Sequence, residues 1–218
     1  MNKSHNKYDL VLLDLDGTTA DTDELIVRTM HTLYDKYRNG IYTPLEQIYY
    51  FSGPPIKETL KKEFPDKDID LILQEFVRIS YDLYEVCVKP FPHVLEVLKT
   101  LRNRGVYIGV VTTKASAATA KCLKVIGMDE LVDFVVTYQD VAMIKPHPEG
   151  LFKCMEHFSI KDKKRVLYIG DNLGDYQAGR NAGVDVAMVT WGPRKIKEPI
   201  TPDYWIDSFK EVEDITYE

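Results

Sequence analysis

Four short apolar segments of this chain each end in polar side chains, and this repetition restricts the fold. The segments are Leu10–Leu13, Val106–Val111, Phe134–Val136 and Val166–Ile169. Continuous apolar runs are typical of strands buried in a parallel sheet, and polar groups can follow such strands at low cost only where the chain leaves the sheet. The pattern therefore predicts an α/β fold with its polar groups along one rim, where ligands bind in open α/β sheets.

The first polar cluster is Asp14-Leu15-Asp16-Gly17-Thr18. Its two carboxylates stand two residues apart and thus on one face of a strand tip. Gly17 allows a sharp turn and a close approach of the backbone to a ligand, and Thr18 adds a hydroxyl group. Taken alone, this pentapeptide could also be an ordinary acidic turn, but such a turn does not predict the later clusters.

The later clusters supply hydroxyl groups, a cation and further carboxylates. Thr112-Thr113-Lys114 follows the second segment, Lys145 comes after the third, and Gly170-Asp171-Asn172 ends the fourth. A rim that combines these groups suits a phosphate and Mg²⁺, because Mg²⁺ prefers oxygen ligands.

With these motifs the chain resembles the haloacid-dehalogenase-like phosphohydrolases. Their four motifs match Asp14 to Thr18, Thr112, Lys145 and Gly170 to Asp175, in the family's order and over nearly the whole chain. Further segments are similar to the branch of phosphoglycolate phosphatases and pyrophosphatases: Glu24-Leu25-Ile26, Ser52-Gly53-Pro54-Pro55, Gly109 to Lys114 and Asp140-Val141.

The resemblance assigns roles to particular residues. Asp14 is expected to be the nucleophile that forms an aspartyl-phosphate, and Asp16 the general acid and then the general base. Asp171, Asp14 and the backbone carbonyl of Asp16 are expected to hold Mg²⁺, with Asp175 supporting these metal ligands.

Lys145 and Thr112 are expected to be catalytic residues beside the transferring phosphoryl group. Lys145 offsets the negative charge at the site, and the Thr112 hydroxyl donates to the phosphoryl oxygens. The expected substrate-binding residues are Gly17, Thr18, Thr113, Lys114 and Gly53. The alternative interpretations are that Lys145 is a solvated loop lysine and that Thr112 and Asp175 cap the helices expected from near Ser116 and from Tyr176.

Two positions depart from the family's usual pattern. Thr19 stands where leucine is more common, which makes the entry to the helical region more polar. His147 stands where aspartate is frequent, and we expect it to be a surface loop residue. Neither change removes an expected catalytic atom.

The region after Ala20 changes to helical periodicity. Apolar residues recur at helical spacing from Leu25 to Tyr37, with possible caps at Asp21 and Thr22, and again from Ile69 to Val86. We therefore expect a doubly wound, Rossmann-like core domain of residues 1–20 and 90–218, with residues 21–89 as an inserted helical cap domain. The resemblance implies that this cap closes over bound phosphate, with hinges near residues 20–22 and 89–91.

Composition limits the possible partners and the location. The chain has 218 residues, of which 44% are hydrophobic, and a net charge of −6 from 28 basic and 34 acidic residues. No basic stripe suggests nucleic acid, and no apolar run approaches the ~20 residues of a membrane span. Three widely spaced cysteines favour reduced thiols. We expect a cytoplasmic monomer or homodimer.

The sequence thus predicts a Mg²⁺-dependent phosphatase that acts on a small phosphorylated metabolite, with phosphoglycolate or pyrophosphate as leading substrates. Asp16, Asp171 and Asp175 argue against a dehalogenase of the same fold, which needs neither a general acid nor Mg²⁺. A phosphosugar mutase would retain every motif and differ only in its cap. A receiver-like phosphoacceptor module would collect similar groups but would have no cap.

Overall fold

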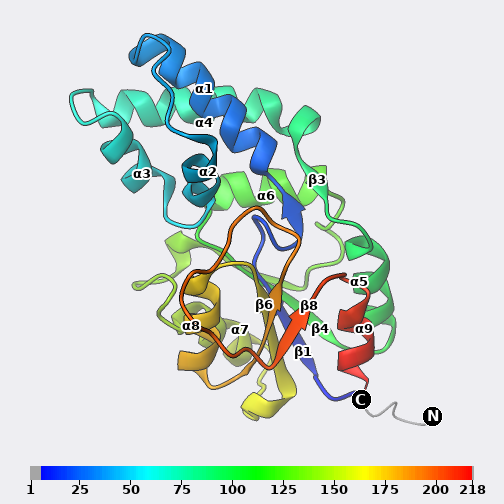
Figure 1. The fold of residues 1–218 in the computed structure, drawn as a ribbon. Coiled ribbons are helices and arrows are strands. Elements are labelled where there is room, and N and C mark those ends of the chain that lie inside the picture. The colour runs from blue at the N-terminus through cyan, green and yellow to red at the C-terminus, as the bar shows by residue number, and fades with distance from the viewer. Residues whose placement is uncertain (1–5, 218) are drawn as a thin grey trace.

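A computed structural model describes residues 6–217 of the protein. Within these residues the main sheet has six parallel strands in the order β5-β4-β1-β6-β7-β8 (Figure 1). They are β1 (Leu10–Leu13), β4 (Tyr107–Val111), β5 (Phe134–Val136), β6 (Val166–Gly170), β7 (Asp185–Val189) and β8 (Tyr204–Ile206). The four apolar segments of the sequence are the four adjacent strands β5, β4, β1 and β6, so the predicted α/β fold is confirmed.

Helices cover both faces of this sheet. Helices α5 (Val94–Asn103), α6 (Ser116–Val125) and α9 (Glu211–Thr216) pack on one face, and α7 (Glu149–His157) and α8 (Leu173–Ala182) on the other. Strand β1 is buried from both sides because Val11 and Leu13 join the first apolar cluster, whereas Leu10 and Leu12 join the second. Short 3₁₀ helices are η2 (Tyr138–Asp140) and η3 (Lys163–Arg165).

The chain between β1 and β4 carries a separate group of helices, which we call the helical insertion. It consists of α1 (Asp23–Tyr37), α2 (Leu45–Ile48), η1 (Tyr49–Ser52), α3 (Ile56–Glu63) and α4 (Ile69–Cys87). These helices bury their own apolar cluster, which includes Met30, Leu33, Leu60 and Ile72. The segments leading into and out of the insertion, β2 (Ala20–Asp21) and β3 (Lys89–Pro90), pair with each other in antiparallel fashion.

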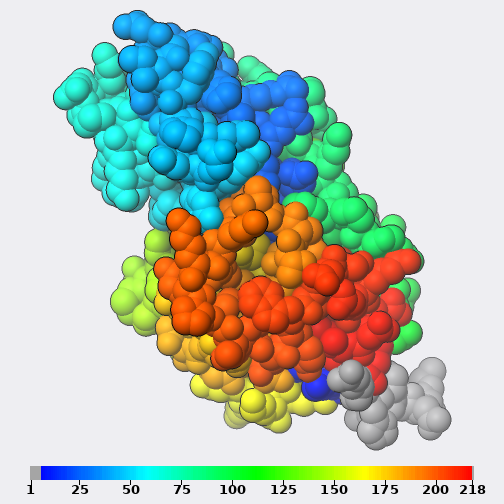
Figure 2. Space-filling model, viewed as in Figure 1, coloured from blue at the N-terminus to red at the C-terminus, as the bar shows by residue number. Residues whose placement is uncertain are grey.

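The insertion lies over the edge of the main sheet at which the strands have their carboxyl ends (Figure 1). Figure 2 shows its cyan part against the orange segment that follows β7. Across residues 6–217, no helix is both long and apolar enough to cross a membrane.

Some expected helix caps differ from the structure. Ala115, not Thr112, occupies the N-cap position of α6. Helix α8 begins three residues earlier than expected, at Leu173, with Asn172 as its N-cap and Asp175 completing a capping box. At α1, Thr22 occupies the N-cap position but makes no capping hydrogen bond there.

Candidate active site

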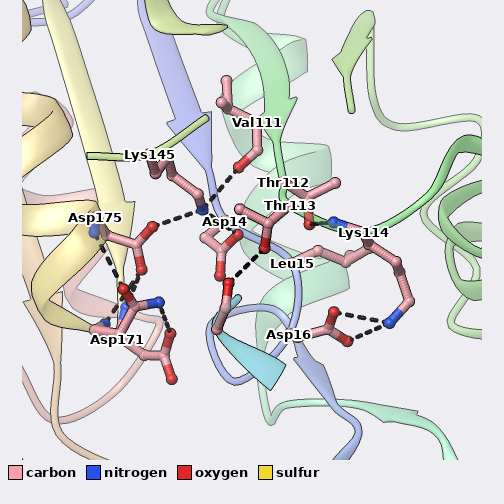
Figure 3. A network of polar contacts seen from close by, with 12 residues as sticks. Asp14, Leu15, Asp16, Val111, Thr112, Thr113, Lys114, Lys145, Asp171 and Asp175 are labelled. Atoms are coloured by element: carbon pink, nitrogen blue, oxygen red, sulfur yellow. Dashed lines mark hydrogen bonds and ion pairs between the residues drawn. The ribbon is translucent and has the colours of Figure 1, made fainter. Parts of the chain in front are cut away.

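The carboxyl ends of β1, β4 and β6 bring the predicted motifs together at one rim. Asp14 follows β1 and hydrogen bonds through its amide to the carbonyl of Ile169 in β6 at 2.9 Å. Asp14, Thr112 and Asp171 are all buried. Figure 3 shows the side chains of Asp14 and Asp175 meeting at Lys145, with Asp171 nearby, whereas the Thr112 hydroxyl faces the Lys114 amide.

Lys145 connects the carboxylates of this cluster. Its ammonium lies 2.7 Å from Oδ1 of Asp14 and 2.6 Å from Oδ1 of Asp175, and it also donates to the Tyr168 hydroxyl at 3.1 Å. The Lys145 side chain is 7% exposed. The alternative of a solvated loop lysine is therefore wrong.

Asp175 is fully buried beneath the cluster. Its Oδ1 accepts from Tyr168 at 2.8 Å as well as from Lys145, and its Oδ2 accepts from the amides of Asp171 and Asn172, both at 3.2 Å. A Cβ atom on Gly170 would lie within 3 Å of the Asp175 side chain, so only glycine fits at that position. Both Asp175 oxygens are engaged, which suits a residue that orients its neighbours.

Asp16 points away from this cluster toward Lys114 (Figure 3). The Lys114 ammonium lies 2.8 Å and 2.7 Å from the two Asp16 oxygens, and the Thr22 hydroxyl donates to Oδ1 at 2.8 Å. Burial alone would lower the pKa of Lys114, but the Asp16 carboxylate outweighs burial and raises it. Asp16 thus accepts hydrogen bonds from Lys114, which follows β4, and from Thr22, which precedes the first helix of the insertion.

The predicted hydroxyl groups occupy different settings. The Thr112 hydroxyl accepts from the amide of Lys114 at 3.2 Å, whereas the Thr113 hydroxyl donates to the carbonyl of Gly53 in the loop after η1 at 2.7 Å. Thr113 therefore links the sheet to the insertion. The Thr18 hydroxyl is buried and has no hydrogen-bond partner among residues 6–217.

Gly17 has a φ of +84°, and a Cβ atom there would collide with the side chains of Asp171 and Arg194. The close approach predicted at Gly17 is thus made, in this structure, by two side chains of the protein. Glycine is required because of both this conformation and this contact.

The two departures from the family pattern fit the local structure. The buried Thr19 hydroxyl donates to the carbonyls of Asp14 at 3.1 Å and Leu15 at 3.3 Å, so its polarity is satisfied within the turn. His147 lies in the loop before α7, where its Nδ1 accepts from the amide of Glu149 at 3.3 Å.

Arg194 is a member of the site that no motif predicted. It follows β7, and its Nε lies 2.6 Å from Oδ2 of Asp171. Its Nη1 reaches the helical insertion, at 2.6 Å from Oδ1 of Asp23 and 2.9 Å from the carbonyl of Tyr49. The signal available in the sequence was a fifth apolar run, Val186 to Val189, whose polar continuation must lie at the same rim.

The acidic cluster has the composition of a metal site. Asp14, Asp171 and Asp175 each offer a carboxylate oxygen, and these three atoms lie within 4.8 Å of one another. Burial raises the pKa of Asp14 to about 8 despite Lys145, and that of Asp171 to about 6 despite Arg194. A divalent cation would relieve this excess of buried negative charge, and oxygen donors suit a hard cation. The residues present therefore fit such an ion.

Comparison with known proteins identifies the family. Residues 11–189 match the haloacid dehalogenase-like hydrolases, and the chain belongs to this family. The predicted membership and the prediction of a hydrolytic enzyme are confirmed. The receiver-like alternative, which predicted no helical insertion, is excluded.

Individual relatives cover almost the whole chain. The chain is 34% identical over 209 residues to pyrophosphatase PpaX of Bacillus thuringiensis (strain Al Hakam), covering 94% of this chain and 95% of the relative. A haloacid dehalogenase-like hydrolase from Bacteroides fragilis superposes with a TM-score of 0.82 at 26% identity, covering 94% of this chain and 100% of that one. A protein described as a predicted phosphoglycolate phosphatase, from Haemophilus somnus 129PT, shares the fold with a TM-score of 0.86 at 22% identity, over 97% and 99% of the two chains.

Proposed function

We propose that the protein is a Mg²⁺-dependent phosphatase that hydrolyses a small phosphate monoester or pyrophosphate through an aspartyl-phosphate on Asp14. The observation that carries the proposal is the position of the buried Asp14 carboxylate, which contacts Lys145 at 2.7 Å and shares one oxygen cluster with Asp171 and Asp175. The 34% identity to a pyrophosphatase over nearly the full chain supports the same class of substrate.

The first half of the reaction uses Asp14 and Asp16. A carboxylate oxygen of Asp14 attacks phosphorus, the bond from phosphorus to the leaving oxygen breaks, and Asp16 gives that oxygen a proton where the leaving group needs one. Asp16 must therefore be protonated at this step, and its hydrogen bonds to Lys114 must yield to one with the substrate.

The second half restores both residues. A water molecule attacks the phosphorus of the aspartyl-phosphate while Asp16 takes its proton, and inorganic phosphate leaves as the Asp14 carboxylate is regenerated. Lys145 stays beside the reacting oxygens throughout and offsets their charge.

Mg²⁺ would be held by Asp14, Asp171 and the backbone carbonyl of Asp16, and when bound it supplies positive charge that stabilises the phosphoryl oxygens. Asp175 orients this set from behind through the amides of Asp171 and Asn172. The Thr112 and Thr18 hydroxyls and the segments around Gly17, Thr113, Lys114 and Gly53 are the proposed phosphate and leaving-group contacts.

We further propose that residues 21–89 form a cap domain on a core of residues 1–20 and 90–218. The separate apolar cluster of the insertion and the paired β2 and β3 at its base support this division. Closure of the cap would exclude bulk water while Asp14 attacks. A cytoplasmic location is proposed from the three free, buried cysteines, Cys87, Cys122 and Cys154.

The test is phosphate release from pyrophosphate, phosphoglycolate and other small phosphate esters, with Mg²⁺ or with a chelator. We expect metal-dependent turnover that an Asp14→Asn variant lacks. Interconversion of sugar phosphates without release of phosphate would instead identify a mutase, and silence of folded protein across the panel would refute the proposal.

A further inference from the structure

Arg194 joins the proposed metal site to the helical insertion. Through Nε it holds Asp171, a proposed metal ligand, and through Nη1 it holds Asp23 of α1 and the carbonyl of Tyr49 in η1. Its side chain is 3% exposed. A buried guanidinium with carboxylates on both sides is held much more firmly than a surface ion pair.

The surroundings of Arg194 place its charge next to the proposed metal site. A Cβ atom on Gly17 would collide with Nη2 of Arg194 and with Oδ2 of Asp171, so the guanidinium lies against the backbone that directly follows Asp16. Nη2 is buried without a hydrogen-bond partner among residues 6–217. The Arg194 guanidinium is thus hydrogen bonded to carboxylates through Nε and Nη1, whereas Nη2, on the side facing Gly17, has no partner among the described residues.

A second contact fastens the same loop to the insertion. The Tyr50 hydroxyl accepts from the amide of Lys195 at 3.1 Å and donates to its carbonyl at 3.0 Å. The loop after β7 is therefore attached to the insertion through Tyr50. Arg194, in the same loop, links the insertion to Asp171 as well.

We propose that Arg194 is a positioning residue that fastens the helical insertion to Asp171 in the metal-free enzyme, and that a divalent cation bound at Asp171 loosens this contact. The inference rests on the metal site of the proposed function. Two positive charges would share one carboxylate, and arginine cannot relieve the repulsion by losing its proton. This coupling is reciprocal. If metal binding weakens the Arg194 contact by a given free energy, the Arg194 contact weakens metal binding by the same free energy.

The first test is calorimetric titration with Mg²⁺ alone. Arg194→Gln removes the competing charge, so we expect it to bind Mg²⁺ at least about tenfold more tightly than the unaltered protein. Arg194→Lys keeps a positive charge but cannot span all three acceptors, and its affinity should stay within about threefold of the original. Arg180→Gln, which removes an arginine paired with Asp203 away from the site, is the matched control and should change nothing.

Equal or weaker Mg²⁺ binding by Arg194→Gln would overturn the inference. Absence of Mg²⁺ binding by the unaltered protein, or binding that Asp171→Asn leaves intact, would instead refute the proposed metal site. The two failures are therefore distinguishable.

The second test uses the unaltered protein and does not depend on a variant that folds. We expect Mg²⁺ to speed hydrogen exchange of the amides in η1 (Tyr49–Ser52) severalfold, because these residues lose the hold of Arg194. In Arg194→Lys, exchange there should already be fast without metal and should respond little to Mg²⁺. Slower exchange in η1 of the unaltered protein on addition of Mg²⁺ would contradict the proposed loosening.

Discussion

The ammonium of Lys145 lies 2.7 Å from Oδ1 of Asp14 and 2.6 Å from Oδ1 of Asp175, so one buried cation connects the proposed nucleophile to the residue proposed to orient the metal ligands. Burial disfavours a charged lysine, but the two carboxylates outweigh it and raise the pKa of Lys145 well above its usual range. Lys145 is therefore charged at neutral pH, and we expect both the stability of the site and the proposed catalysis to depend on it.

Replacement of Lys145 by methionine should impair both properties. It leaves Asp14 and Asp175 buried without their cation, so we expect the free energy of unfolding to fall by about 3–5 kcal/mol. We expect kcat to fall by about 10²–10³-fold, as for loss of a group that stabilises transition-state charge. Urea unfolding and phosphate release measure the two effects. Lys164→Met, whose side chain is 77% exposed, is the control and should stay within about 0.5 kcal/mol. A fully active Lys145→Met would refute the role of this lysine.

Asp16→Asn should separate the two halves of the reaction. We expect steady-state kcat for an alkyl phosphate to fall by about 10²–10⁴-fold, because the leaving oxygen lacks its proton donor. A nitrophenyl phosphate needs no such proton, so the first step should survive while the attack of water slows. Rapid mixing should then show a burst of nitrophenol followed by slow turnover. Unchanged turnover of both substrates would show that Asp16 is not the general acid or base.

The stability of the metal-free protein should fall as pH rises. Burial raises the pKa of Asp14 from 3.8 to about 8, so between these values the folded state holds a proton that the unfolded state has lost. The free energy of unfolding therefore decreases with rising pH in this window. We expect the unfolding temperature in chelator to drop over this range and Mg²⁺ to make this drop smaller. Asp14→Asn should flatten the drop between about pH 6 and pH 8, because the raised pKa of Asp171, about 6, contributes only at lower pH. The same slope in Asp14→Asn would contradict the assignment to Asp14.

Leu60→Ala should destabilise the helical insertion and leave the stability of the main sheet unchanged. Leu60 is fully buried in the cluster formed by α1, α3 and α4, and Leu60→Ala should cost this unit about 2–5 kcal/mol. Hydrogen exchange should rise in α1, α3 and α4 while β1 and β6 keep their protection. Leu71→Ala, at a side chain 48% exposed, serves as the control. Simultaneous loss of protection in β1 and β6 would argue against a separate cap domain.

The local features of the fold were predictable from sequence because they depend on short-range patterns. Buried parallel strands require unbroken apolar runs, so β1, β4, β5 and β6 could be located, and their polar ends then identified one rim. The sequence predicts the start of α8 three residues too late because Asn172, rather than Asp175, is its N-cap, and both residue types suit that position.

The contacts made across the chain could not be predicted in this way. Arg194 reaches Asp171 and Asp23 only because the loop after β7 folds back under the insertion, and no spacing in the sequence encodes that path. The pairing of Lys114 with Asp16 likewise joins the ends of two neighbouring strands, β4 and β1. The sequence pattern predicts Lys114 at the rim but does not predict which carboxylate it pairs with.

Trapping of the phosphoryl group tests the central claim most directly. Enzyme turning over pyrophosphate or phosphoglycolate with Mg²⁺ is quenched in acid, and the peptide containing Asp14 is analysed by mass spectrometry. We predict a phosphoryl adduct on Asp14 that hydroxylamine removes and that Asp14→Asn cannot form. Metal-dependent turnover with no adduct on Asp14, retained by Asp14→Asn, would contradict the mechanism.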